Sequence, residues 1–422
     1  MKGGDAPARR GDLTVAALII GLRGGMLIAK FLLALFIARF IGLDELGIYG
    51  LISGAAAVMP VAMRCGVFAK LSRDAVHNEP TLLAKDLRHY ASGVFTLYVL
   101  IAPVAAAVGW YFGHPELALL ALAVAMSEHA ITDVVALMTN LDRPGQANVL
   151  YALQSAAWIY VFMALALMYP DLRVLNWILA FWIGGSMLAL AIAVSLVRDW
   201  PWAEAFRRPL QRSWFVRNVR ASWRLYISEV VAVLTLYSDR YLLTLFLPLV
   251  QVGVFVLFWQ MASAIGNLVG AGVLQVYRAR LIRAGRSDDA AGFQSLYRES
   301  LSRGLAAGVL LSLAVAPAAI YLITFSKQPL AMGYLPLLGL MLVCLQIRIW
   351  ADAAKNAAYT RQQDQLVMSS NLLSLLTGVA LSFALIPVYG LYGVIGPMAA
   401  AQAVIIVFLT LKSARPLPEH PV

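Results

Sequence analysis

The chain has 422 residues, of which 61% are hydrophobic and 13% are charged, and it carries a formal net charge of +11. Soluble domains are about half apolar and about 25% charged, so this composition excludes an ordinary soluble protein. The positive charge does not by itself indicate nucleic-acid binding, because that function needs basic residues gathered on a water-facing surface, which most of this chain does not offer.

The N-terminal segment is basic and leads into an apolar run that reaches Ile41. This run is too long for the apolar region of a signal peptide, and it lacks a small-residue cleavage pattern. We therefore expect it to be a retained first transmembrane helix.

Apolar runs of the length needed to cross a membrane, about 20 residues, recur along the whole chain. Divided at charged or Pro/Gly-rich positions, they predict an all-α polytopic membrane protein with about twelve transmembrane helices. The predicted helices lie near residues 13–40, 46–70, 88–112, 117–139, 147–168, 175–198, 219–246, 252–276, 299–324, 332–355, 365–386 and 393–412.

The distribution of basic residues orients these helices. With the N-terminus inside, 25 of the 33 Lys and Arg lie at cytosolic ends and loops, and only three lie on the outer face. The positive-inside rule then predicts that both termini are cytosolic. All the predicted outer loops are short, so they leave no room for a catalytic domain outside the membrane.

An internal repeat appears when the chain is shifted by 206 residues. Matched pairs include Phe40 with Phe246, Leu43 with Leu249, Gly47 with Gly253, and Leu51 with Leu257. Six predicted helices separate the copies, which favours two pseudo-symmetric six-helix bundles. We expect an N-terminal bundle at 1–198, a basic and aromatic cytosolic linker at 199–218, and a C-terminal bundle with a short cytosolic tail at 219–422. The linker suits either an interfacial segment on anionic headgroups or a plain basic connection.

The first outer turn, ARFIGLDELGIYGLISG, resembles the signature of polysaccharide-export flippases of the Wzx type, in the multidrug/oligosaccharidyl-lipid/polysaccharide (MOP) superfamily. The matching positions are Arg39, Ile41, Gly42, Gly47 and Tyr49. The second half carries YSDRYLLTLFLPLVQVGVFVL, which resembles the seventh helix of the same family at Asp239, Arg240, Gly253 and Phe255. It departs from that pattern at Pro248 and Leu249, where a Leu-Gly pair is usual, and at Phe255, where Tyr is usual.

The resemblance implies two MATE-like six-helix bundles in a bacterial inner membrane, alternately open to the cytosol and the periplasm. It implies movement of an undecaprenyl-diphosphate-linked oligosaccharide, an O-antigen or exopolysaccharide repeat unit, between leaflets. The implied partners are this substrate, inner-membrane lipids, and a polysaccharide polymerase with its chain-length machinery. It implies no cofactor and no nucleic acid.

Cations within the predicted spans are candidate ligands for the diphosphate, because charges in a membrane are costly and usually face a cavity or a partner. Arg23 and Lys30 lie two turns apart on the first helix, and Arg64 lies on the second, each without an anion on its own helix. Arg348 on the tenth predicted helix is a fourth candidate. The alternative for Arg23, Arg64 and Lys30 is pairing with Glu128 or Asp133.

The remaining intramembrane charges are candidates for gating or coupling. Asp239 and Arg240 are expected at an outer gate, whereas Glu229 and Asp133 are candidate sites for H⁺ or Na⁺ if transport is ion-coupled. Asp352 lies four residues after Arg348, so this pair fits either a cavity wall or charges satisfied along one helix.

An enzyme is not expected, since the sequence has no nucleotide-phosphate loop, no His cluster with metal-ligand spacing and no G-x-S-x-G motif. The alternative function is a multidrug or toxic-compound cation antiporter of the same fold. Such a transporter needs an acidic cavity, whereas a flippase for a diphosphate needs a basic one. The charge of the cavity therefore discriminates between them.

Overall fold

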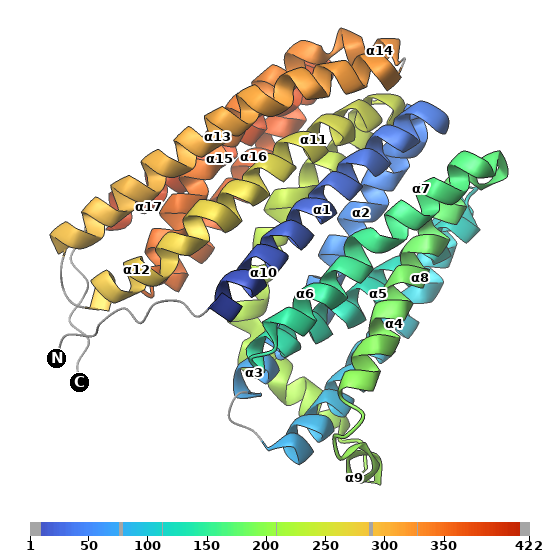
Figure 1. Ribbon diagram of the computed structural model, residues 1–422, viewed down its shortest axis with the longest axis vertical. Coiled ribbons are helices and arrows are strands. Elements are labelled where there is room, and N and C mark those ends of the chain that lie inside the picture. Colours follow the sequence, from blue (N-terminus) through green and yellow to red (C-terminus); the bar gives the residue numbers. More distant parts are fainter. Residues whose placement is uncertain are drawn as a thin grey trace. The chain divides into compact units, whose positions relative to one another are not determined.

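The computed structural model describes residues 10–75, 79–111, 113–207, 209–286, 290–326 and 328–413, and these ranges contain helices and turns but no strand (Figure 1). The first half contains α1 (Arg10–Phe40), α2 (Leu43–Arg64), α3 (Val67–Asp74), α4 (Pro80–Tyr111), α5 (Pro115–Asn140), α6 (Pro144–Ala152), the π-helical η1 (Leu153–Ala157), α7 (Trp158–Met168), the 3₁₀ turn η2 (Pro170–Leu172), α8 (Leu175–Leu196) and α9 (Trp202–Arg207). The second half contains α10 (Arg212–Phe246), α11 (Leu249–Val269), the π-helical η3 (Gly270–Leu274), α12 (Gln275–Arg286), α13 (Ala290–Ser326), α14 (Pro329–Gly333), α15 (Leu335–Thr360), α16 (Asp364–Tyr389), the 3₁₀ turn η4 (Gly390–Val394) and α17 (Ile395–Ser413).

The all-helical class predicted from the apolar runs is confirmed. Among the described residues, nine continuous helical segments are long and apolar enough to cross a membrane, and the last of them holds both α16 and α17. The chain is thus a multi-pass membrane protein, in which helices satisfy every backbone group within one segment. Ten of the twelve predicted spans overlap these segments, and the other two, 13–40 and 219–246, lie in α1 and α10. Twelve membrane crossings with both termini in the cytosol stay a prediction.

Four of the helices begin at a proline residue. Pro80, Pro115, Pro144 and Pro329 each occupy the first position of a helix. Proline suits this position because its backbone needs no donor there and its φ angle is already helical. These residues set the boundaries of α4, α5, α6 and α14 after short turns.

The chain divides into two compact units whose bounds differ from the predicted bundles. Unit 1 comprises residues 1–33 and 55–227, and unit 2 comprises 34–54 and 228–422. The physical reason is that α1, α2 and α10 are long helices, each of which begins in one unit and continues into the other. The division predicted from the sequence was placed at loops between helices. The boundary between the two compact units instead falls within these three helices.

The basic and aromatic segment predicted as a linker packs against the rest of unit 1 through several of its aromatic residues. Trp200, Trp214 and Phe215 lie against a buried cluster that includes Phe68 and Tyr90. The Arg88 guanidinium donates to the backbone carbonyl of Ala205 at 2.7 Å. The segment is therefore part of the unit and not a free connection.

Within unit 1, α5 is the central helix, with α4, α6 and α8 beside it (Figure 1). Its C-terminal half packs through Ile131 and Met138 against Leu150 of α6 and Ala189 and Ala193 of α8. The small alanine side chains let these helices approach closely, as is common between membrane helices. This position brings polar residues of α5 next to side chains of several other helices.

Within unit 2, the repeated turn sequences meet each other. A Cβ atom on Gly47 of α2 would meet the carbonyl oxygen of Leu249, and one on Gly253 of α11 would meet the carbonyl oxygen of Leu43. Both pairs are related by the same shift of 206 residues, and Gly50 likewise meets Val256. Such reciprocal contacts are typical of a two-fold relation, so α2 and α11 cross as equivalent elements.

Candidate functional site

A buried polar network in unit 1 surrounds Asp133 of α5. The Arg64 Nε atom donates to Asp133 Oδ1 at 2.6 Å, and the Tyr90 hydroxyl of α4 donates to Asp133 Oδ2 at 2.6 Å. His129 Nε2, one turn before Asp133, lies 3.1 Å from Oδ2 and 2.9 Å from the Tyr90 hydroxyl. On its other side, His129 Nδ1 lies 3.2 Å from the Tyr98 hydroxyl. One carboxylate thus organises side chains from α2, α4 and α5.

The pairing alternative is confirmed for Arg64. Its guanidinium forms an ion pair with Asp133, and the two side chains are 17% and 9% exposed. Only Nε takes part in this hydrogen bond, whereas Nη2 is buried and has no hydrogen-bond partner. A buried donor without a partner is energetically costly, so an acceptor that reached Nη2 would gain a favourable hydrogen bond. Arg64 can therefore bind an acceptor in addition to Asp133. The Asp133 carboxylate, in contrast, accepts bonds on both oxygens.

A second polar cluster in unit 1 surrounds Glu128, also on α5. The Gln154 amide and the Trp182 indole both donate to this carboxylate. Lys30 of α1 lies close enough for its charge to act on Glu128. Gln154 belongs to the π-helical segment η1, a bulge of a kind frequent at functional sites. Lys30 therefore also has a carboxylate of α5 nearby.

Arg23 lies within α1, but its side chain is outside the part of the chain that the structure describes. Its predicted contact with a diphosphate stays a prediction. Two of the three cations predicted on the first two helices thus lie near carboxylates of α5: Lys30 is close to Glu128, and Arg64 forms an ion pair with Asp133.

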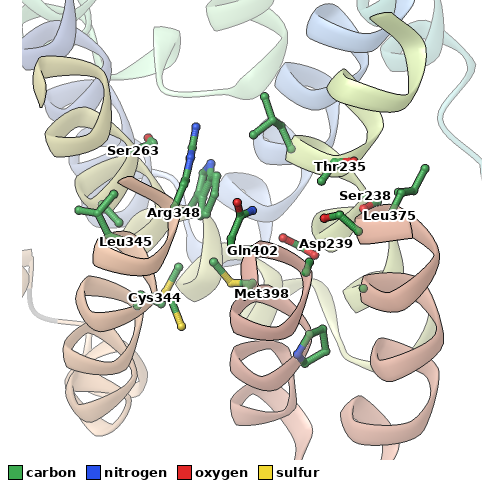
Figure 2. A pocket seen from close by; sticks show the side chains of 18 residues that line it. Thr235, Ser238, Asp239, Ser263, Cys344, Leu345, Arg348, Leu375, Met398 and Gln402 are labelled. Atoms are coloured by element: carbon green, nitrogen blue, oxygen red, sulfur yellow. The ribbon is translucent and has the colours of Figure 1, made fainter. Parts of the chain in front are cut away.

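Unit 2 contains a polar cavity between α10, α11, α15, α16 and α17, with an internal volume of about 40 Å³ that water can reach. Figure 2 shows Gln402 between Arg348 and Asp239 in this cavity. Ser238, Ser263 and Ser374 add hydroxyl groups to its wall. The volume admits a few waters or a small ion, because one water needs about 10 to 15 Å³ on this measure.

Arg348 and Asp352 lie on one face of α15, as their spacing predicts. Asp352 is 2.7 Å from the Lys355 ammonium and 3.7 Å from the Arg348 guanidinium, so these charges satisfy each other along one helix. Arg348 also covers the ring of Trp259 at 5.4 Å and lines the cavity. Both sequence alternatives thus hold for Arg348. Glu229 of α10 lies near Tyr359 of α15 and is not one of the residues that line the cavity.

Arg240 has a structural position within unit 2. It is 3% exposed, and its Nη1 atom donates to the Gly50 carbonyl at 3.0 Å and to the Ser53 hydroxyl at 2.8 Å. It therefore holds the first half of α2 against α10. Its neighbour Asp239 faces the cavity instead. A role of the pair in gating stays a prediction.

The motif residues of the first turn shape the junction of α1 and α2. Gly42 has a φ of +152°, and its N–H donates to the Ile37 carbonyl at 2.9 Å. Tyr49 is buried at 4% exposure, and the Arg39 guanidinium covers the ring of Phe40 at 5.3 Å. Of the residues predicted in turns, Gly42 forms the turn, whereas Arg39 lies in the last turn of α1, and Gly47 and Tyr49 lie in α2.

Sequence reasoning missed His129, Tyr90 and Tyr98 as members of the Asp133 network. The spacing of His129 and Asp133, four residues apart, was an available signal, because such residues share one helix face. No spacing rule, however, connects Tyr90 or Arg64 to Asp133. Among the described residues, no group of His, Cys, Asp and Glu has the geometry to hold a metal ion.

The fold is similar to those of solved MOP superfamily transporters. A multidrug resistance MATE family transporter in an inward-facing conformation gives a TM-score of 0.72 at 12% identity, covering 93% of this chain and 94% of that one. The lipid II flippase MurJ, in an inward closed conformation, gives a TM-score of 0.76 at 12% identity, covering 94% of this chain and 88% of that one. A MOP superfamily transporter from Pyrococcus furiosus, described as having a binding pocket of reverse polarity, gives 0.54 at 14% identity, covering 94% and 95%. No family model and no curated protein sequence matches the chain. At these identities the likeness shows the fold alone.

Proposed function

We propose that this chain is a transporter that moves an undecaprenyl-diphosphate-linked oligosaccharide from the cytosolic to the periplasmic leaflet by alternating access. The substrate class is an O-antigen or exopolysaccharide repeat unit, as the sequence resemblance implies. The fold supports a transporter, since the solved neighbours include a lipid II flippase and multidrug transporters.

The environment of Arg64 is the observation that favours an anionic substrate over a cationic one. The Asp133 carboxylate beside it already accepts two hydrogen bonds and lies 3.1 Å from His129 Nε2, and Glu128 accepts two hydrogen bonds. The guanidinium, in contrast, has a buried donor without a partner. A diphosphate supplies several charged acceptors, and planar guanidinium groups bind such oxygens well. The unused capacity in this network therefore favours an anion over a cation.

Lys30 and Arg23 join Arg64 as the proposed diphosphate ligands of unit 1, and Arg348 of unit 2 is a further candidate. Lys30 shares the environment of Glu128, and Arg348 is held along α15 by Asp352. In this proposal the substrate diphosphate competes with these carboxylates for their cations. Competition of this kind lets the site release the substrate after it has crossed the membrane.

The unit 2 cavity supports coupling to H⁺ or Na⁺. Asp239 supplies a carboxylate, Gln402 an amide and Ser374 a hydroxyl, and the space suits a small ion and not a sugar. The oxygen atoms of Gln402 and Ser374 are buried and have no hydrogen-bond partner. Oxygen ligands of this kind bind hard cations.

A cation antiporter of the same fold is the second candidate. The acidic side chain of Asp239 in the unit 2 cavity favours it, as does the likeness to multidrug transporters. The two functions predict opposite substrate charges, which makes them separable in one assay.

The test uses the purified full chain in liposomes. A fluorescent polyprenyl-diphosphate disaccharide reports flipping through dithionite bleaching, and ethidium flux under a proton or sodium gradient reports cation export. We expect flipping of the diphosphate by the wild type and at least a tenfold loss in Arg64→Gln. Arg303→Ala is the control, because Arg303 is an exposed cation whose ion pair is with Glu299 of its own helix. Ethidium flux without diphosphate flipping would overturn the proposal in favour of the antiporter.

A further inference from the structure

His129 is a buried histidine, 2% exposed, that the proposed substrate contacts do not use. The Tyr90 hydroxyl has one proton, and the 2.6 Å bond to Asp133 Oδ2 uses it. Its oxygen must therefore accept from His129 Nε2 at 2.9 Å, which assigns a proton to Nε2 in the neutral ring. The basic lone pair then lies on Nδ1, which faces the Tyr98 hydroxyl.

The Tyr98 hydroxyl can form a hydrogen bond with His129 Nδ1 whether or not Nδ1 carries a proton. Its hydroxyl lies 3.2 Å from His129 Nδ1 and 3.3 Å from the Ala125 carbonyl oxygen. When the ring is neutral, the hydroxyl donates to Nδ1. When Nδ1 carries a proton, it donates to the Tyr98 oxygen, and the hydroxyl proton turns to Ala125. Neither state needs a heavy atom to move, so the geometry accommodates both protonation states of the ring.

The charges around His129 decide when that proton binds. The groups facing it are Asp133 on its own helix, Tyr90 and Tyr98 on α4, and Arg64 across Asp133 on α2. The adjacent Glu128 is engaged elsewhere, with Gln154, Trp182 and Lys30. While Arg64 holds Asp133, the pair is neutral and does not require a second cation. If Arg64 leaves, a buried carboxylate remains without a cation, which is strongly unfavourable.

We propose that His129 binds a proton when Arg64 engages an anionic substrate, and so replaces Arg64 as the cationic partner of Asp133. The proton comes from water and binds Nδ1, while the Nε2–H group, 3.1 Å from Asp133 Oδ2, supplies the contact. The Asp133 site keeps a net charge of zero in both states. This inference rests on the proposed function and deepens it, because each captured diphosphate would carry one proton into the site.

The first test needs no substrate. Full-length chain labelled with ¹⁵N-histidine is examined by NMR at pH 7 as wild type, Arg64→Lys and Arg64→Gln, with His129→Gln used to assign the signal. We expect a neutral His129 in the wild type and in Arg64→Lys, which keeps the cation. In Arg64→Gln we expect a protonated ring. A neutral ring in a folded Arg64→Gln variant would overturn the inference, as would a protonated ring in the wild type.

The second test measures proton uptake when undecaprenyl diphosphate is added to the detergent-solubilised chain in weak buffer. We expect the wild type to take up about one more proton per bound molecule than His129→Gln, which also carries the test if Arg64→Gln does not fold. Equal uptake by the two proteins, with binding intact, would overturn the role of His129 and leave the proposed function standing. Absence of any binding by the wild type would overturn the proposed function, while the substrate-free NMR comparison still decides the response of His129 to Arg64.

Discussion

At the scale of single residues, α5 supplies the carboxylates that organise the polar interior of unit 1. Asp133 binds Arg64 of α2, and Glu128 lies near Lys30 of α1. Burial of unpaired charges in a membrane costs several kcal/mol, so pairing is what keeps these cations in the apolar layer. The same pairs set the energy that a substrate must overcome to bind.

Substitutions at Lys30 and at the nearby Glu128 separate the effect of Lys30 on stability from its effect on transport. In Lys30→Met, Glu128 loses its cation, so we expect lower thermal stability together with loss of diphosphate flipping. The double variant Lys30→Met/Glu128→Gln removes both charges, so its melting temperature should return toward that of the wild type while flipping stays lost. Thermal unfolding and the liposome assay measure the two quantities. Recovered flipping in the double variant would contradict a role of Lys30 in substrate binding.

Arg240 provides a second prediction at this scale. Substitution by Met removes the donors to the Gly50 carbonyl and to Ser53 Oγ. Hydrogen bonds from charged groups contribute about 1.5 to 3 kcal/mol, so we expect the free energy of unfolding to fall by about that amount. Ser53→Ala is the matched control, since it removes only one acceptor. Equal stability of Arg240→Met and wild type in detergent would show that this contact does not hold α2.

At the scale of elements, the crossing of α2 and α11 depends on the two repeat-related glycines. The backbones approach so closely at Gly47 and Gly253 that a Cβ atom on either would meet a carbonyl oxygen of the other helix. Since a backbone carbonyl cannot rotate away as a side chain does, the close approach requires glycine at both positions. Here a local sequence feature determines a tertiary contact directly.

Gly47→Ala and Gly253→Ala should therefore destabilise the protein to a similar extent. Overpacking costs about 1 to 3 kcal/mol, and the equivalence of the two contacts predicts similar shifts in melting temperature. Gly184→Ala in α8 is the control, because a Cβ there meets nothing within 4 Å and alanine favours helix. A shift for Gly47→Ala no larger than that for Gly184→Ala would argue against the close crossing.

At the scale of the whole molecule, 25 of the 33 Lys and Arg fall in segments predicted on the same side as the N-terminus, and this asymmetry predicts the orientation in the membrane. In a variant without Cys65 and Cys344, single cysteines at Asp171 and Arg143 test the orientation, since both positions are exposed in turns. We expect a membrane-impermeant maleimide to label Asp171→Cys in intact cells, and Arg143→Cys only after permeabilisation. The opposite pattern would place the termini outside.

The sequence by itself determined the helical class, the approximate positions of the helices and the turn at Gly42, whereas Gly47 and Gly253, which the motif predicted in turns, lie inside α2 and α11. The reason is that a membrane permits few structures, so apolar length, proline and glycine dictate the helices locally. Only the tertiary structure decided that Arg64 pairs with Asp133, 69 residues away, and that Tyr90, Tyr98 and His129 join them. It also decided that α1, α2 and α10 each contribute to both compact units. Spacing gives the face of a helix on which a charge lies, whereas its partner depends on how helices distant in sequence are rotated against each other, which packing alone determines.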